Sequence, residues 1–181
     1  PDWADDKITR AVFESVKEKF PDVKVYQASS SEMFGSSVDD DNYQRESTPM
    51  HPVSPYGCSK LYAYSIARNY RQAYGLFISN GILFNHESPR RGTNFVTAKV
   101  VKGALDIKFG KKEKLELGNL DSYRDWGHSY DYTRAMIKLM FLDNPDDIII
   151  STGKAYSVRQ LCEFVFNKLN LNYKDYVLIN K

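Results

Sequence analysis

The sequence predicts an α/β fold in which helices connect the strands of a parallel sheet. Short apolar runs alternate with longer segments that show helical spacing or helix caps. These helical segments are about 10–20 residues long, which suits crossovers between parallel strands. A chain of 181 residues with 42% hydrophobic residues can bury a sizeable core. Since no internal repeat or linker interrupts the pattern, we expect one continuous unit over residues 1–181.

The first expected elements are a helix and a strand. Residues 5–19 place apolar side chains at helical spacing, and Pro21 ends this helix. Residues 24–28 are predicted to form a strand, with the serines at 29–31 as its exit loop. Residues 36–54 are polar and contain two prolines and three consecutive aspartates, so we expect a surface loop there.

A long helix is expected next. Ser54 suits its N-cap and Pro55 its first turn, while Gly75 directly after Tyr74 suits its end. An apolar strand is expected over 76–84. The remaining expected elements are a polar loop over 85–92, a helix over 93–109, a strand over 114–117, a helix over 128–142, a strand over 147–151 and a helix over 157–169 with Ser157 as its cap.

The charge pattern argues against nucleic acid and membrane partners. The net charge is +2 and both signs are interspersed, so we expect no nucleic-acid binding. One dense basic cluster surrounds Gly110 and is interpreted as a solvated loop before a strand: Lys108, Lys111, Lys112 and Lys114. No run approaches the roughly 18 apolar residues of a membrane span, and no signal peptide opens the chain, so we expect no membrane segment.

The cysteines and histidines do not indicate a metal site. Cys58 and Cys162 lack the spacing of a zinc site or a disulfide framework, which suits a reducing, cytoplasmic setting. His51, His86 and His128 are not at ligand spacing with cysteines or carboxylates, so we expect no bound metal. The absence of a G-x-S-x-G string argues against a serine hydrolase.

Tyr56 and Lys60 are the first catalytic candidates. They lie four residues apart on the long helix and therefore share a face. A neighbouring ammonium lowers the pKa of a phenol, so such a pair can take a proton from a hydroxyl group. With 13 tyrosines in the chain this spacing also arises by chance, and the pair alone favours a non-catalytic interpretation.

Ser30 and Glu32 follow the first expected strand. Ligands of open α/β sheets bind at the carboxyl ends of strands. Ser30 can there hydrogen-bond a reacting hydroxyl, and Glu32 can act as a second acid/base. The alternative is that Ser30 is a turn residue and Glu32 a solvated cap.

Two further clusters carry polar and cationic groups. The loop 85–92 contains Arg90 and Arg91 beside a glycine, and guanidinium groups bind phosphates in a bidentate manner. Residues 124–128 combine Arg, Asp, Trp and His where a helix is expected to begin. The alternatives are solvated arginines, a structural His86, and a buried ion pair with an aromatic plug.

Five strings resemble the GDP-mannose 4,6-dehydratase family of extended short-chain dehydrogenases. They are YQASSSEMFG (26–35), SPYGCSKLYAY (54–64), NGILFNHESPRRG (80–92), LGNLDSYRDWGH (117–128) and STGKAYSVRQ (151–160). The resemblance covers about residues 23–160, and its loop strings are far more specific than Tyr-x-x-x-Lys.

The resemblance implies the C-terminal part of a Rossmann-like doubly wound parallel sheet plus part of a small substrate-binding domain. The Rossmann-like part would cover about 1–92 and 128–151, and the substrate-binding part about 93–127 and 152–181.

The resemblance also implies roles for individual residues. The catalytic group would be Ser30, Glu32, Tyr56 and Lys60, with Ser30 where the family usually has Thr. The implied cofactor contacts are Tyr56, Lys60, His86 and Arg91, and the implied substrate contacts are Asn85, Val96, Lys99, Asn119 and Arg124.

The implied activity is that of a hydro-lyase that uses tightly bound NADP. GDP-mannose would become GDP-4-dehydro-6-deoxymannose and water. Tyr56 would take the 4-hydroxyl proton while hydride leaves C4, and Glu32 would remove the C5 proton and protonate the departing 6-hydroxyl. Hydride would then return to C6. The resemblance further implies a cytoplasmic homo-oligomer, either a dimer or a tetramer.

The sequence departs from the family pattern in three places. No G-x-G occurs among its ten glycines, so the Gly-rich nucleotide-binding loop is not in this sequence. We therefore expect a fragment without the N-terminal Gly-rich region and the C-terminal end, inactive by itself, whose open sheet edge needs cover. The polar loop over 36–48 looks longer than usual and could alter a lid, while Cys58 is expected to be neutral.

Two alternatives stay open. A related NAD(P)-dependent sugar-nucleotide epimerase or reductase would not need Glu32. A non-catalytic remnant that acts as an interaction module would explain the missing Gly-rich loop, but not the intact set of Ser30, Glu32, Tyr56 and Lys60.

Overall fold

The computed structural model describes residues 6–180 and divides the chain into two compact units. Unit 1 consists of the residues up to Phe84 together with Tyr130–Ser151, and unit 2 consists of Asn85–Ser129 together with the residues from Thr152 onward. The chain passes between the units at three places. These repeated passages explain why no single linker is recognisable in the sequence.

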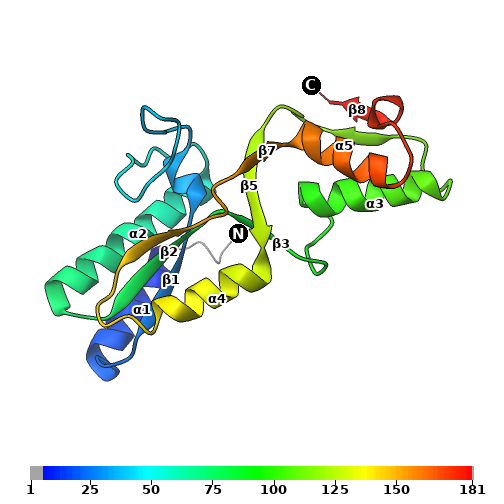
Figure 1. Ribbon diagram of the computed structural model, residues 1–181. Helices are drawn as coiled ribbons and strands as arrows, with labels where there is room; N and C mark the ends of the chain where they lie inside the picture. Colours follow the sequence, from blue (N-terminus) through cyan, green and yellow to red (C-terminus); the bar gives the residue numbers. More distant parts are fainter. Residues whose placement is uncertain (1–5, 181) are drawn as a thin grey trace. The chain divides into compact units, whose positions relative to one another are not determined.

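Unit 1 is a parallel sheet of three strands in the order β1-β2-β6, with helices packed on it (Figure 1). Its strands are β1 (Val25–Ser30), β2 (Ile78–Leu83) and β6 (Asp147–Ile150), and its helices are α1 (Asp6–Lys19), η2 (Ser31–Phe34), α2 (Pro55–Tyr74) and α4 (Ser129–Leu139). This arrangement confirms the α/β class and the parallel sheet.

The central strand β2 is buried along its whole length and shows which helices cover which face. Ile78 and Ile82 pack in clusters with residues of α1 and α2, whereas Leu83 packs in a cluster with Leu139 of α4. Since successive side chains of a strand point to opposite faces, α1 and α2 cover one face and α4 covers the other.

The helix α2 begins and ends where the sequence predicts. The Oγ atom of Ser54 accepts a hydrogen bond from the backbone N–H of Gly57 at 3.0 Å, and Pro55 occupies the first turn. Gly75 adopts the left-handed conformation with φ 67°, and its N–H donates to the carbonyl of Arg71 at 3.1 Å. Both ends are therefore set by local chemistry.

Unit 2 combines two small sheets with two helices. Its elements are β3 (Asn85–Glu87), α3 (Val96–Lys108), β4 (Leu115–Leu117), β5 (Tyr123–His128), β7 (Ala155–Ser157), α5 (Val158–Lys168), η3 (Tyr173–Asp175) and β8 (Val177–Ile179). The strand orders are β3-β5-β7 and β4-β8. Val100 of α3 and Phe166 of α5 are fully buried in the core of this unit. Ser157 caps α5 in a capping box with Gln160, as the sequence predicts.

Two expectations for this region were wrong. The segment 85–92 is not entirely a loop, because its first three residues form β3 and pair with β5. Residues 124–128 do not open a helix but belong to β5, and α4 begins only at Ser129. Because β3 pairs with β5, residues 85–92 lie in unit 2, whereas the sequence grouped them with the Rossmann-like part.

The first strand also extends further than expected. Ser29 and Ser30, expected in an exit loop, belong to β1 because they pair in parallel register with Ile82 and Leu83 of β2. The short strands β7 and β8 were not foreseen at all. Ser30 is thus the last residue of a strand, where side chains of open α/β sheets meet ligands.

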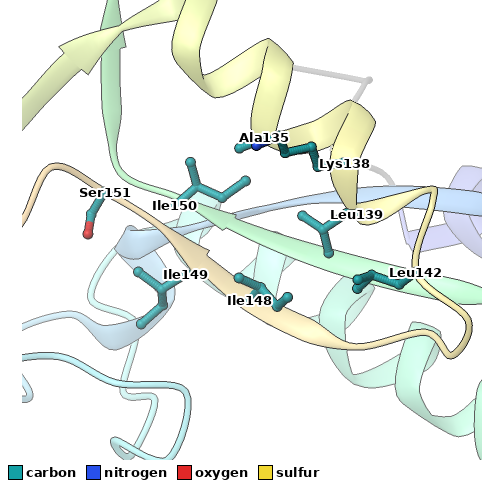
Figure 2. Close-up of a pocket in the computed structure, with 8 residues that line it drawn as sticks. All are labelled: Ala135, Lys138, Leu139, Leu142, Ile148, Ile149, Ile150 and Ser151. Carbon is teal, nitrogen blue, oxygen red and sulfur yellow. The ribbon is translucent and has the colours of Figure 1, made fainter.

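Two apolar hollows lie on unit 1. One, of about 360 Å³, lies between α4 and β6 (Figure 2) and is lined by Ala135, Lys138, Leu139, Leu142, Ile148, Ile149, Ile150 and Ser151. The other lies on α1 and the residue after it, where Ile8, Val12 and Phe20 are exposed. Neither hollow contains a candidate catalytic residue. Among the described residues, no helix is both long enough and apolar enough to cross a lipid bilayer.

Candidate active site

Tyr56 and Lys60 lie in the first two turns of α2, and both are partly buried. The Nζ atom of Lys60 lies 5.7 Å from the centroid of the Tyr56 ring and donates a hydrogen bond to the carbonyl of Ala28 at 3.0 Å. Burial lowers the pKa of Lys60. The ammonium group is therefore held between the start of α2 and the strand β1.

Ser30 and Glu32 lie at the end of that same strand. The Oγ atom of Ser30 accepts a hydrogen bond from the backbone N–H of Glu32 at 3.2 Å and so caps the short helix η2. Met33 and Phe34, the next two residues, are fully buried and anchor η2 in the core. The exposed Glu32 side chain is thus presented from a well-anchored turn.

Glu32 also contacts the start of α2. Its Oε2 atom accepts a hydrogen bond from the Oγ atom of Ser54 at 3.0 Å. The backbones approach closely here, since a Cβ atom on Gly57 would lie 2.8 Å from the carbonyl oxygen of Glu32. A residue larger than glycine at position 57 would push α2 away from η2. The structure therefore brings together the candidate catalytic residues of unit 1.

The polar loop between Glu32 and Tyr56 is held by ion pairs. The guanidinium of Arg45 contacts Asp39 at 2.8 Å and Asp41 at 2.5 Å, and it lowers the pKa of Asp41 to about 2. Thr48 is buried, and its hydroxyl donates to Asp39 at 2.7 Å. The loop lies at the surface, as expected, and these ion pairs and hydrogen bonds hold it together internally.

The candidate cofactor contacts His86 and Arg91 lie in unit 2. His86 belongs to β3 and pairs with Gly127 of β5. The guanidinium of Arg91 lies 3.4 Å from the centroid of the Phe95 ring, and its Nε atom lies 3.2 Å from a carboxylate oxygen of Glu87. Stacking and charge together hold the guanidinium in one orientation. The guanidinium of Arg91 is thus held in place before a ligand binds, in the segment that leads into α3.

The five candidate substrate contacts also lie in unit 2. Asn85 pairs with Trp126, so it lies on the strand next to the one that carries Arg124. Val96 begins α3 and packs partly buried against the core of unit 2, which supports a structural role as well. The other three side chains are exposed: Lys99, Asn119 and Arg124.

Asp125 lies in β5 next to the candidate substrate contact Arg124, and the sequence did not reveal its role. A buried ion pair was one alternative for residues 124–128. The buried carboxylate of Asp125 instead accepts hydrogen bonds from backbone N–H groups of the segment after β6. The donors are Thr152 at 3.0 Å, Gly153 at 2.8 Å and Lys154 at 3.2 Å. The only local signal is Gly153, which has a positive φ of 76°.

Ser54 and Gly57 are the other residues whose full roles were missed. The sequence marked Ser54 only as a helix cap, and it gave no signal for its contact with Glu32. The two positions are 22 residues apart and are separated by the polar loop. Among the described residues, no group of three or more His, Cys, Asp or Glu side chains is arranged to hold a metal ion.

Comparison with known proteins identifies the family. A family model described as GDP-mannose 4,6 dehydratase matches residues 8–179. GDP-mannose 4,6 dehydratase 2 of Arabidopsis thaliana is 51% identical over 159 residues, covering 88% of this chain and 42% of the relative. The human GDP-mannose 4,6 dehydratase is 53% identical over 144 residues, covering 80% of this chain and 38% of the relative. The chain thus spans less than half the length of these relatives.

Two solved structures have the same fold as this chain. The dTDP-glucose 4,6-dehydratase of Bacillus anthracis in complex with NAD has a TM-score of 0.85 and 27% identity, covering 96% of this chain and 54% of that chain. The RMD protein of Pseudomonas aeruginosa complexed with NADPH has a TM-score of 0.86 at 22% identity, covering 95% of this chain and 59% of that chain, and shows the fold alone. Together with the family match, these likenesses confirm the Rossmann-type fold, and the chain belongs to the GDP-mannose 4,6-dehydratase family.

Proposed function

We propose that this chain supplies the acid–base residues of an NADP-dependent GDP-mannose 4,6-dehydratase, a hydro-lyase. The observation that carries the proposal is the contact between Glu32 and the start of α2, the helix that bears Tyr56 and Lys60. A dehydration that begins with oxidation needs two acid/base groups, one for the hydroxyl and one for the neighbouring carbon. Family membership supports GDP-mannose as the substrate.

In this proposal each residue has one task. Ser30 orients the 4-hydroxyl, and Tyr56, beside the Lys60 ammonium, takes its proton. Glu32 removes the C5 proton once C4 has become a ketone, and it returns a proton to the departing 6-hydroxyl. When hydride returns to C6, C5 needs one proton, which balances the proton that Tyr56 took from the 4-hydroxyl. Water is the leaving product.

The residues fit one end of a nicotinamide cofactor. The half-buried ammonium of Lys60 at the start of α2 and the stacked guanidinium of Arg91 supply cations of the kind that ribose hydroxyls and phosphates bind. Tyr56, Lys60, His86 and Arg91 would hold NADP, which when bound would accept hydride from the sugar and return it. A Gly-rich loop for the pyrophosphate does not occur in this sequence.

The remaining substrate contacts are assigned from the same family. We infer that Asn85, Val96, Lys99, Asn119 and Arg124 contact GDP-mannose. The exposed cations of Lys99 and Arg124 suit its diphosphate. We further infer a cytoplasmic homo-oligomer, a dimer or tetramer, which the exposed apolar side chains of α1 support.

The test is to replace the matching segment of the Arabidopsis thaliana relative with residues 8–179 of this chain. This chimaera is expected to convert GDP-mannose to the 4-keto, 6-deoxy product when NADP⁺ is added. The chain alone is expected to show little or no turnover, because it contains no Gly-rich loop. No 4-keto product from a folded chimaera would overturn the proposal.

Glu32→Gln separates a dehydratase from an epimerase or reductase. In the chimaera it should abolish loss of water while oxidation at C4 remains partly intact, since only the second acid/base is removed. Product is followed by ¹H NMR and cofactor reduction by absorbance. Unchanged dehydration in Glu32→Gln would contradict the role of this carboxylate.

A further inference from the structure

We propose that Ser54 is a positioning residue that holds the acid/base carboxylate of Glu32 against the start of α2. The inference rests on the proposed function and deepens it, because it names the group that fixes the second acid/base relative to Tyr56. Its basis is the contact of Ser54 with both Glu32 and Gly57.

Counting hydrogens shows why the hydroxyl of Ser54 is directed at Glu32. A serine hydroxyl has one hydrogen to donate and lone pairs that accept. The Oγ atom of Ser54 accepts the N–H of Gly57 at 3.0 Å, and this bond uses a lone pair. Its single hydrogen is therefore available for Oε2 of Glu32, which lies 3.0 Å away and has no N–H or O–H of its own when ionised.

The geometry is set by backbone packing rather than by the two side chains. Gly57 is buried, and its contact with the carbonyl oxygen of Glu32 leaves no room for a side chain. Met33 and Phe34 fix η2 in the core, in the same buried cluster as Tyr64 of α2. The distance between Ser54 and Glu32 is thus imposed by the core.

The contact with Ser54 fixes the orientation of the Glu32 carboxylate. Glu32 is exposed, so its side chain would otherwise sample several rotamers. The bond from Ser54 engages Oε2, so Oε1 stays available to a substrate. One carboxylate can then take a proton from C5 and deliver it to the 6-hydroxyl without reorienting.

The test compares three substitutions of Ser54 with one control. Ser54→Ala removes the helix cap and the bond to Glu32. Ser54→Asp keeps an acceptor for the helix cap but has no hydrogen to donate to Glu32. Ser54→Thr keeps both the acceptor and the donor. Ser157→Ala is the matched control, since Ser157 also caps a helix, accepting the N–H of Gln160 at 3.1 Å in unit 2.

The first readout uses this chain and needs no activity. The side-chain carboxyl carbon of Glu32, observed by ¹³C NMR at neutral pH, should shift in Ser54→Ala and Ser54→Asp. It should stay near its original position in Ser54→Thr and Ser157→Ala. Amide exchange of Gly57 should rise in Ser54→Ala only, which separates the loss of the cap from the loss of the contact with Glu32. A Glu32 signal that does not respond to Ser54→Ala or Ser54→Asp would overturn the proposal.

The second readout is exchange of the C5 hydrogen of GDP-mannose with D₂O in the chimaera. We expect about a 10²-fold loss in Ser54→Ala and Ser54→Asp, the scale for misplacing a catalytic group by about 1 Å. The loss should fall mainly on kcat, with recovery in Ser54→Thr. An equal loss in Ser157→Ala would reduce Ser54 to a structural cap. If the unsubstituted chimaera is inactive, the proposed function fails, and the NMR readout alone decides the role of Ser54.

Discussion

The carboxylate of Glu46 accepts a hydrogen bond from the backbone N–H of Ile149 at 2.8 Å. Ile149 lies in β6, an edge strand of the sheet in unit 1. The N–H groups of Asn80 in β2 and of Phe84, directly after β2, donate to the carbonyls of Asp146 and Ile150. Ile149 therefore points its N–H away from β2. The polar loop thus covers an edge group that would otherwise be open to another strand.

Glu46→Ala should uncover the edge of β6. We expect faster amide exchange at Ile149 and a loss of about 1 kcal/mol in the free energy of unfolding, since one hydrogen bond is removed. Glu46→Gln is the matched control, because its amide oxygen still accepts. Exchange at Ile149 that stays the same in Glu46→Ala would show that the loop does not protect the edge.

Asp147 joins all three strands of unit 1 to α2. Its carboxylate contacts the guanidinium of Arg71 at 2.8 Å and accepts a hydrogen bond from Nδ2 of Asn80 at 2.7 Å, and Asn80 in turn accepts from Ser29 at 3.2 Å. Asp147→Ala should lower the free energy of unfolding by about 3 kcal/mol in urea titrations, because a largely buried guanidinium loses its partner.

Asp131 provides the control for Asp147. Its contact with Arg134 is 3.9 Å long, and both side chains are more than half exposed. Asp131→Ala should change the free energy of unfolding by no more than about 0.5 kcal/mol. Equal losses in the free energy of unfolding for Asp147→Ala and Asp131→Ala would show that burial does not strengthen the ion pair of Asp147.

Asp125→Asn should loosen the segment after β6. Asparagine has one acceptor oxygen, and its amide hydrogens would face the N–H groups of Thr152, Gly153 and Lys154. We expect a loss of about 2 kcal/mol in the free energy of unfolding and faster exchange at these three amides. The control is Asp121→Asn, whose partner Arg159 lies at the surface. Unchanged exchange at Gly153 in Asp125→Asn would contradict this role.

The two cysteines should differ sharply in reactivity. Cys162 is fully buried, and burial raises its pKa to about 11, whereas Cys58 is exposed. Because the thiolate is the reactive form, an aromatic disulfide reagent at pH 8 should label one thiol quickly and the second only after unfolding. Cys58→Ser should remove the fast phase. Two equally fast thiols in the native protein would contradict the burial of Cys162.

Local signals explain which elements were predicted well. The start of α2 depends on Ser54 and Pro55 and its end on Gly75, all within a few residues of the helix termini. The strand β2 was recognisable because all of its residues are buried on a sheet covered on both faces. β3 was missed because three polar residues form a strand only when β5, from far along the chain, pairs with them.

Motifs and periodicity are properties of short segments, and they were enough to infer the α/β class, the family and the candidate residues Ser30, Glu32, Tyr56 and Lys60. The bond from Ser54 to Glu32, the cover that Glu46 gives the edge of β6 and the contact of Asp125 with the segment after β6 became visible only in the folded chain. These contacts join positions between 22 and 103 residues apart. Their geometry follows from how the core packs, and no local pattern encodes it.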